Sequence, residues 1–143
     1  MTLYLDTSAI VALLVEERAS ERLQAWLSAR EAEGLATSRW TEAEVASALS
    51  LKVRTGEFTV AQRAEAAAGW RAWREGLLLL DVEAAAFETA AAFASRPDLG
   101  LRAGDALHLA VAAAAGSTLV TLDERMAKAA PEVGVPVADV GEG

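Results

Sequence analysis

Short apolar runs alternate with helical patterns along the whole chain. In the helical stretches apolar residues recur about every 3.6 positions, whereas the short runs are too brief for a helix. The runs that predict strands cover residues 3–5, 35–37, 77–80 and 118–121, with a last edge strand at 135–137. This alternation is typical of an α/β domain with a parallel sheet. We therefore expect a three-layer α/β/α sandwich with a central parallel sheet of four to five strands.

The helical stretches have recognisable ends. They cover residues 7–15, 19–32, 39–53, 60–76, 81–95, 103–115 and 123–130. Thr59 precedes the helix at 60–76 and Asp81 starts the helix at 81–95, and both are candidate N-caps. Gly34 and Gly116 follow two other helices and are candidate C-terminal stops. Residues 77–80 include no polar side chain and so predict a fully buried strand.

The length and composition fit one domain. With 143 residues, of which 53% are hydrophobic, the chain can bury a core of its own, and we expect residues 1–143 to form a single domain. Its longest apolar runs fall far short of the roughly 20 residues that a membrane-spanning helix needs. Its first residues also differ from a signal peptide, because Asp6 falls where an apolar segment should be. We expect a cytoplasmic protein that is not bound to a membrane.

Residue types limit the chemistry further. There is no Cys and only one His, His108, so thiolate metal sites, a cysteine nucleophile and a Ser-His-Asp arrangement have little support. The formal net charge of −8 argues against a broad basic surface for nucleic acid. Four acidic residues account for half of this net charge, and two divalent cations bound to them would neutralise that half. An acidic chain can therefore still act on a phosphodiester if metal ions make the contact.

These four acidic residues stand where a parallel sheet would bring them together: Asp6, Glu44, Asp105 and Asp123. Asp6 ends the first strand, and Asp123 follows the fourth strand. Asp105 begins an Ala-rich helix, and Glu44 lies one turn into the helix after the second strand. In open parallel sheets, ligands gather at the carboxyl ends of the strands. Each acid taken alone could instead be a helix cap, a first-turn charge favoured by the helix dipole, or a solvated helix residue.

Clustered carboxylates are suited to a hard divalent cation. Mg²⁺ and Mn²⁺ prefer oxygen ligands, and such an ion can activate water and offset the charge that develops during phosphodiester hydrolysis. Because no suitable His or Lys stands beside these acids as a general base, a metal-activated water is the expected nucleophile, oriented by Ser8 or Thr121. His108 lies between two leucines in a helix that the pattern predicts to be buried, so we expect a core histidine.

Four motifs that contain these acids resemble those of a known family. In order along the chain they are YLDTSA (4–9), WTEAEVASAL (40–49), LRAGDALHLA (101–110) and LVTLD (119–123). Together, at these separations, they resemble the PIN-domain ribonucleases, in particular the VapC-type toxins of prokaryotic toxin–antitoxin modules. The resemblance covers nearly the whole chain.

The resemblance implies a Mg²⁺- or Mn²⁺-dependent endoribonuclease with a PIN-like fold. It implies that Asp6 and Asp105 are the principal metal ligands, and that Asp123 and Glu44 complete the pocket. It also implies an RNA substrate, a homodimer and a cognate VapB-type antitoxin. Such an antitoxin would cover the acidic cleft with a basic side chain, since an Arg pairs well with clustered carboxylates.

Several alternatives stay open on the sequence. Glu42 competes with Glu44 for the second acidic position, and the two lie about 200° apart on a helix, so both cannot face one site equally. A dehalogenase-like phosphatase or phosphotransfer domain would use Asp6 as a covalent nucleophile, although Ser8 stands where the dehalogenase pattern has a second Asp. A PIN fold kept only for binding is a further alternative.

Arg39 and Arg102 are the preferred candidates for phosphate contacts.

Overall fold

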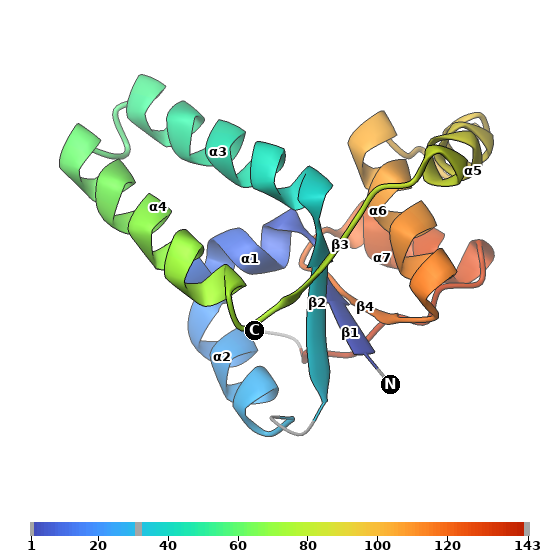
Figure 1. The fold of residues 1–143 in the computed structure, drawn as a ribbon, viewed down its shortest axis with the longest axis horizontal. Coiled ribbons are helices and arrows are strands. Elements are labelled where there is room, and N and C mark those ends of the chain that lie inside the picture. The colour runs from blue at the N-terminus through green and yellow to red at the C-terminus, as the bar shows by residue number, and fades with distance from the viewer. Residues whose placement is uncertain (1, 31–32, 142–143) are drawn as a thin grey trace.

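Four parallel strands form the centre of the fold (Figure 1). The computed structural model describes residues 2–30 and 33–141. The strands are β1 (Thr2–Leu5), β2 (Gly34–Ser38), β3 (Leu78–Leu80) and β4 (Thr118–Val120), in the order β3-β2-β1-β4. Because all neighbouring pairs are parallel, every strand ends at the same edge of the sheet. This is the predicted fold class.

The helices form a layer on each side of the sheet (Figure 1). They are α1 (Thr7–Leu14), α2 (Ser20–Ser28), α3 (Arg39–Arg54), α4 (Val60–Arg74), α5 (Ala84–Ala94), α6 (Ala103–Ala115) and α7 (Glu124–Glu132). The helices α1 to α4 lie on one side in this view, and α5 to α7 lie on the other. Each layer has its own apolar core. Leu3 and Leu5 of β1 belong to the first core, and Tyr4 between them belongs to the second.

Three connections carry the chain directly from the carboxyl edge of the sheet into a helix. Asp6 alone separates β1 from α1, and α3 begins at the residue after β2. The segment from Thr121 to Asp123 joins β4 to α7. The first turns of these helices therefore lie at one edge, which is where the sequence places three of the four acids.

Several helix ends agree with the sequence. Thr59 forms a capping box with Gln62 at the start of α4. Gly116 ends α6 with a φ of 64°, a left-handed conformation that glycine adopts without strain. Within the described residues, no helix is both long and apolar enough to cross a membrane.

Other expectations about the elements are wrong. Residues 135–137 do not form a strand, because Pro136 cannot donate a backbone hydrogen bond and the segment makes a single bridge between Val137 and Leu119. The strand β3 is not fully buried: it lies at an edge of the sheet, and Leu78 is 56% exposed. Asp81 caps no helix, since α5 begins at Ala84 and the Asp81 carboxylate pairs with Arg39 instead.

The helix expected at 19–32 is shorter than its pattern. Its described part, α2, ends at Ser28, and residues 31–32 lie outside the described residues. Gly34 does not stop this helix but begins β2, where it pairs with Thr2 of β1.

Candidate metal centre at the carboxyl edge of the sheet

Asp6 is buried at the junction of β1 and α1. Only 2% of the residue is exposed, and its Oδ1 accepts hydrogen bonds from the backbone N–H of Ala9 (3.0 Å) and from Ser8 Oγ (2.7 Å). Its Oδ2 accepts a hydrogen bond from Thr121 Oγ1. Asp6 is thus the N-cap of α1 as well as a candidate ligand. Because a carboxylate oxygen has two acceptor sites, this bonding leaves one on Oδ2.

The same threonine links Asp6 to Asp123. Thr121 Oγ1 accepts a hydrogen bond from the backbone N–H of Asp123 at 3.0 Å. Asp123 is the N-cap of α7, because its Oδ1 accepts from the backbone N–H groups of Arg125 and Met126. Capping and a place at the site therefore coexist in Asp6 and in Asp123. Ser8 and Thr121, the two hydroxyl residues expected to orient water, both bond to Asp6.

Asp105 and Asp123 line one open cavity of about 470 Å³ at the same edge. Asp105 lies in the first turn of α6, and Arg102, Glu124 and Arg125 complete the lining. Burial raises the pKa of Asp105, and the nearby charges of Asp123 and Glu44 raise it further. These carboxylates are thus close enough to repel one another, which is a physical reason for the site to favour a divalent cation.

Glu44, not Glu42, faces this group. Its Oε1 accepts a hydrogen bond from Thr7 Oγ1 at 2.6 Å and also contacts Nε2 of His108. Burial alone would raise the pKa of Glu44, but the hydrogen bond and charge of His108 and the Thr7 bond hold it below its ordinary value. Glu42 points elsewhere and pairs with Arg74 at 2.8 Å.

His108 is buried in α6, as the sequence predicts, yet it is also part of the site. Its Nδ1 lies 2.7 Å from the hydroxyl of Tyr4, and its Nε2 lies 3.2 Å from Thr7 Oγ1. Sequence reasoning missed Tyr4 and Thr7 as members of the site and gave His108 no contact with an acid. The motifs that contain all three were the available clue, because Tyr4 and Thr7 flank Asp6 and His108 lies one helical turn after Asp105.

The chemistry of these donors fits Mg²⁺ or Mn²⁺. Asp6, Glu44, Asp105 and Asp123 offer hard oxygen ligands, and the pKa of Asp105 is raised by burial and by the nearby charges of Asp123 and Glu44. Among residues 2–30 and 33–141, no three acidic or histidine side chains are already grouped as closely as a metal-binding cluster. Coordination of one ion by three of them would therefore need side-chain movements.

Comparison with known proteins identifies the family. The PIN domain family matches residues 3–131. Ribonuclease VapC35 of Mycobacterium tuberculosis is 35% identical over 148 residues, which cover 98% of each chain. This chain belongs to the VapC-type PIN-domain family.

Solved structures of VapC and VapBC proteins share the fold of this chain. The crystal structure of VapC20 from Mycobacterium tuberculosis, a toxin that cleaves the sarcin-ricin loop, has a TM-score of 0.72 at 20% identity and covers 96% of this chain and 98% of its own. DNA-bound VapBC from Salmonella typhimurium has a TM-score of 0.73 at 17% identity, with 99% of each chain covered. The alignments span the whole α/β/α sandwich, so the carboxyl edge of the sheet belongs to the shared fold.

Asp6→Asn is expected to stabilise the metal-free PIN domain at neutral pH. Burial raises the pKa of Asp6, so the folded state binds this proton more tightly, and stability falls as the pH rises from the usual range of Asp through the raised pKa. Asn carries no charge and caps a helix as well as Asp does. In urea unfolding with EDTA, we expect a gain of about 0.5–2 kcal/mol at neutral pH that shrinks below about pH 4.

Asp139→Asn provides the control, because it removes the same charge at an exposed position. A gain of equal size in this control, or a loss of stability in Asp6→Asn at every pH, would contradict the prediction.

Proposed function

We propose that this PIN domain, over residues 1–143, is a Mg²⁺- or Mn²⁺-dependent endoribonuclease and the toxic component of a toxin–antitoxin module. The observation that carries the proposal is the gathering of Asp6, Glu44, Asp105 and Asp123 at one edge of the sheet, within a fold whose relative VapC35 is named a ribonuclease. The proposed substrate is RNA, and the proposed reaction is hydrolysis of a phosphodiester bond.

Each side chain has a distinct part in the proposed reaction. Asp6 and Asp105 are the principal metal ligands, and Glu44 and Asp123 complete the pocket. When bound, the divalent cation activates water and offsets the charge that develops on the phosphate. Ser8 and Thr121 orient Asp6 through their hydrogen bonds to its two oxygens. The N-cap bonds of Asp123 hold one of its oxygens and leave the other for the cavity.

Two other functions are less well supported. In-line attack by a covalent nucleophile needs an open approach to the carboxylate oxygen, whereas Asp6 is buried. The one acceptor site that its hydrogen bonds leave on Oδ2 suits a small cation better. A PIN fold kept only for binding gives no reason to keep Asp105 close to Asp123 and Glu44, where like charges repel and destabilise the fold. A hydrolytic metal centre accounts for both observations.

The proposed partner is a VapB-type antitoxin that inserts a basic side chain among the carboxylates. The pKa of Asp105 is raised by its acidic neighbours, so an Arg placed there would relieve the same repulsion that a cation relieves. Solved relatives include the DNA-bound VapBC complex of Salmonella typhimurium and a toxin–antitoxin complex from Klebsiella pneumoniae, so relatives of this fold do pair with antitoxins.

Asp105→Asn and Glu44→Gln are each expected to reduce Mg²⁺-dependent RNA cleavage at least about 100-fold, because each removes a proposed metal ligand. Cleavage is measured on a mixed RNA substrate with and without EDTA. In cells, the wild-type chain should arrest growth, the variants should not, and co-expression of the proposed VapB-type antitoxin should restore growth.

Glu42→Gln is the matched control on the same helix, because it removes the same charge from a carboxylate that pairs with Arg74. It should cleave RNA as the wild type does. Undiminished cleavage by Asp105→Asn, in protein with a normal unfolding transition, would refute the proposed function.

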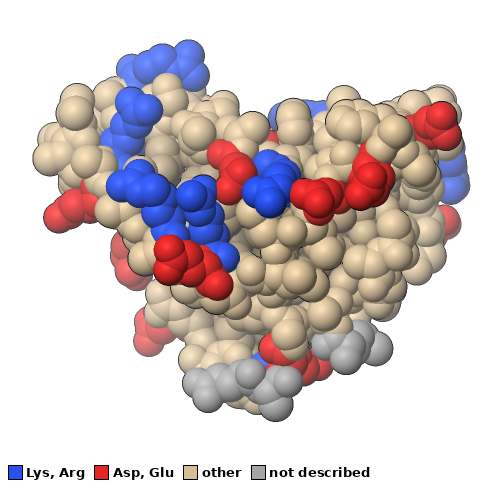
Figure 2. Space-filling model, in the orientation of Figure 1, with Lys and Arg blue, Asp and Glu red and all other residues tan. Residues whose placement is uncertain are grey.

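Arg102 is the preferred phosphate contact. It lines the cavity beside Asp105 and makes no ion pair within the described residues, whereas Arg39, the other candidate, pairs with Asp81 at 2.8 Å. Figure 2 shows basic and acidic side chains interspersed on one face of the molecule, with the basic ones gathered over α3 and α4. A local contact at the cavity therefore suits this acidic chain better than a broad basic surface does.

Arg102→Ala is expected to weaken RNA binding and to reduce its salt dependence. Loss of one phosphate contact on a single strand should lower the slope of log affinity against log salt by about 0.7. Binding is measured in EDTA so that the RNA stays intact. The control is Arg63→Ala on the exposed face of α4, which should leave the slope unchanged, and an unchanged slope in Arg102→Ala would exclude the contact.

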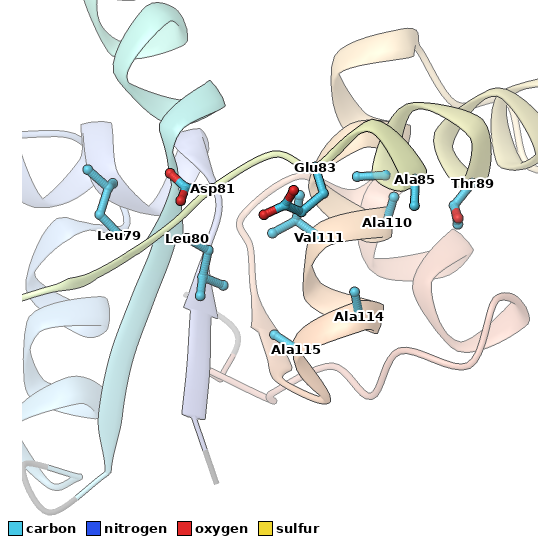
Figure 3. Close-up of a pocket in the computed structure, with 11 residues that line it drawn as sticks. Leu79, Leu80, Asp81, Glu83, Ala85, Thr89, Ala110, Val111, Ala114 and Ala115 are labelled. Atoms are coloured by element: carbon cyan, nitrogen blue, oxygen red, sulfur yellow. The ribbon is translucent and has the colours of Figure 1, made fainter.

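The proposed homodimer would use the face beside the edge strand β3. Figure 3 looks into a depression of about 520 Å³ between β3, α5 and α6, with alanines of α6 on its floor. Leu78 of β3, next to the lining residue Leu79, is a large apolar side chain that is 56% exposed. An edge strand next to exposed apolar side chains is a site where another chain can pair.

Ala114→Glu is expected to convert the proposed dimer into a monomer. Ala114 lines the depression and is exposed in the single chain, so the substitution leaves the fold intact but would bury an unpaired carboxylate in the interface. Light scattering after size exclusion measures the mass. Ala64→Glu on the exposed side of α4 should remain dimeric, and a monomeric wild type would refute this assembly.

A further inference from the structure

The carboxylate of Glu44 is held by only one of its two oxygens. Thr7 Oγ1 and His108 Nε2 both contact Oε1, whereas no hydrogen bond to Oε2 occurs within the described part of the chain. Oε2 lies toward the backbone of Gly104, where an added Cβ would come within 3.1 Å of it. One oxygen is thus fixed by the protein, and the other faces the turn that carries Asp105.

The histidine on Oε1 is itself fixed from the other side. Its ring is 1% exposed, and Nδ1 lies 2.7 Å from the hydroxyl of Tyr4, which is fully buried. The Tyr4 hydroxyl donates to Ser38 Oγ at 2.8 Å, and the two rings pack edge to face with their centroids 5.8 Å apart. A continuous set of contacts therefore runs from β2 and β1 through α6 to Glu44 on α3.

We propose that Tyr4 and His108 are positioning residues that hold Glu44 so that its Oε2 is available to the metal. This inference rests on the proposed function. A glutamate side chain has several rotatable bonds, and fixing it on complex formation costs conformational entropy. Thr7 and His108 already hold Glu44 before the metal binds, so part of this entropy cost is removed. Residues that contact a metal ligand commonly orient that ligand in this way.

A purely structural histidine would be a different case. It would contribute to core stability whether or not Glu44 carried a ligand, and its loss would change unfolding without changing metal affinity. The contacts of His108 end instead on a carboxylate that is partly exposed at the edge of the sheet. The two roles therefore differ in what a small substitution at Tyr4 would do to metal binding.

Tyr4→Phe tests the proposal with the smallest change, because it keeps the buried ring and removes only the hydroxyl that contacts Nδ1. The affinity for Mn²⁺, measured on the RNA-free protein by electron paramagnetic resonance of the free ion, should fall about 10-fold. RNA cleavage should fall at limiting Mn²⁺ and recover toward the wild-type rate when Mn²⁺ is saturating, since the ligands themselves remain.

Substitutions of the ring separate orientation from packing. His108→Gln keeps an N–H that can reach Glu44, whereas His108→Leu fills the space without one. Mn²⁺ affinity should therefore be closer to wild type in His108→Gln than in His108→Leu. The control is Thr2→Val, which removes a hydroxyl contact with Ser117 (2.6 Å) at the opposite end of β1 and should leave Mn²⁺ affinity unchanged.

Wild-type Mn²⁺ affinity in Tyr4→Phe would overturn the proposal, whatever the effect on the unfolding temperature. Should His108→Leu fail to fold, Tyr4→Phe and His108→Gln still decide the question. This failure differs from failure of the proposed function, which would appear as normal cleavage by Asp105→Asn and would not depend on Tyr4.

Discussion

A buried carboxylate where β1 meets α1 is the constraint on which the rest of the site depends. Burying Asp6 disfavours its charged form, which raises its pKa and opposes folding at neutral pH. Hydrogen bonds from Ser8, Ala9 and Thr121 offset part of this cost. Because Thr121 follows β4, the same bonds fix the segment that leads to Asp123 against the end of β1. The carboxylate thus joins two strands that are distant in sequence.

The four acids share an edge of the sheet but not an electrostatic environment. The pKa of Asp6 is raised by burial and that of Asp105 by burial and by its acidic neighbours, whereas the pKa of Glu44 is lowered by its contacts with His108 and Thr7. Among these three acids, the protein therefore favours the charged form of Glu44, whereas Asp6 and Asp105 would gain from a cation. Natural proteins often keep such destabilising groups where function needs them.

The fold class and several helix ends could be predicted from the sequence, whereas the exposure of an element and the contacts between distant side chains could not. The Ala-rich helix at 103–115 and its stop at Gly116 follow from composition and a glycine in the left-handed conformation. The exposure of β3 depends instead on its place at the edge of the sheet, which no run of leucines encodes. Likewise, the contact between His108 and Glu44 spans 64 positions and joins two helices, so the apolar periodicity within either helix does not predict it.

The side chains of β1 point alternately to the two sides of the sheet, which links the two apolar cores to the position of the site residues. Tyr4 and Asp6 are two positions apart and so extend to the same side of the sheet, while Leu3 and Leu5 pack in the core on the opposite side. Shifting β1 by one residue against β2 and β4 would exchange the two cores and displace both site residues together. The register that fills both apolar cores is therefore also the register that brings Tyr4 and Asp6 to the site.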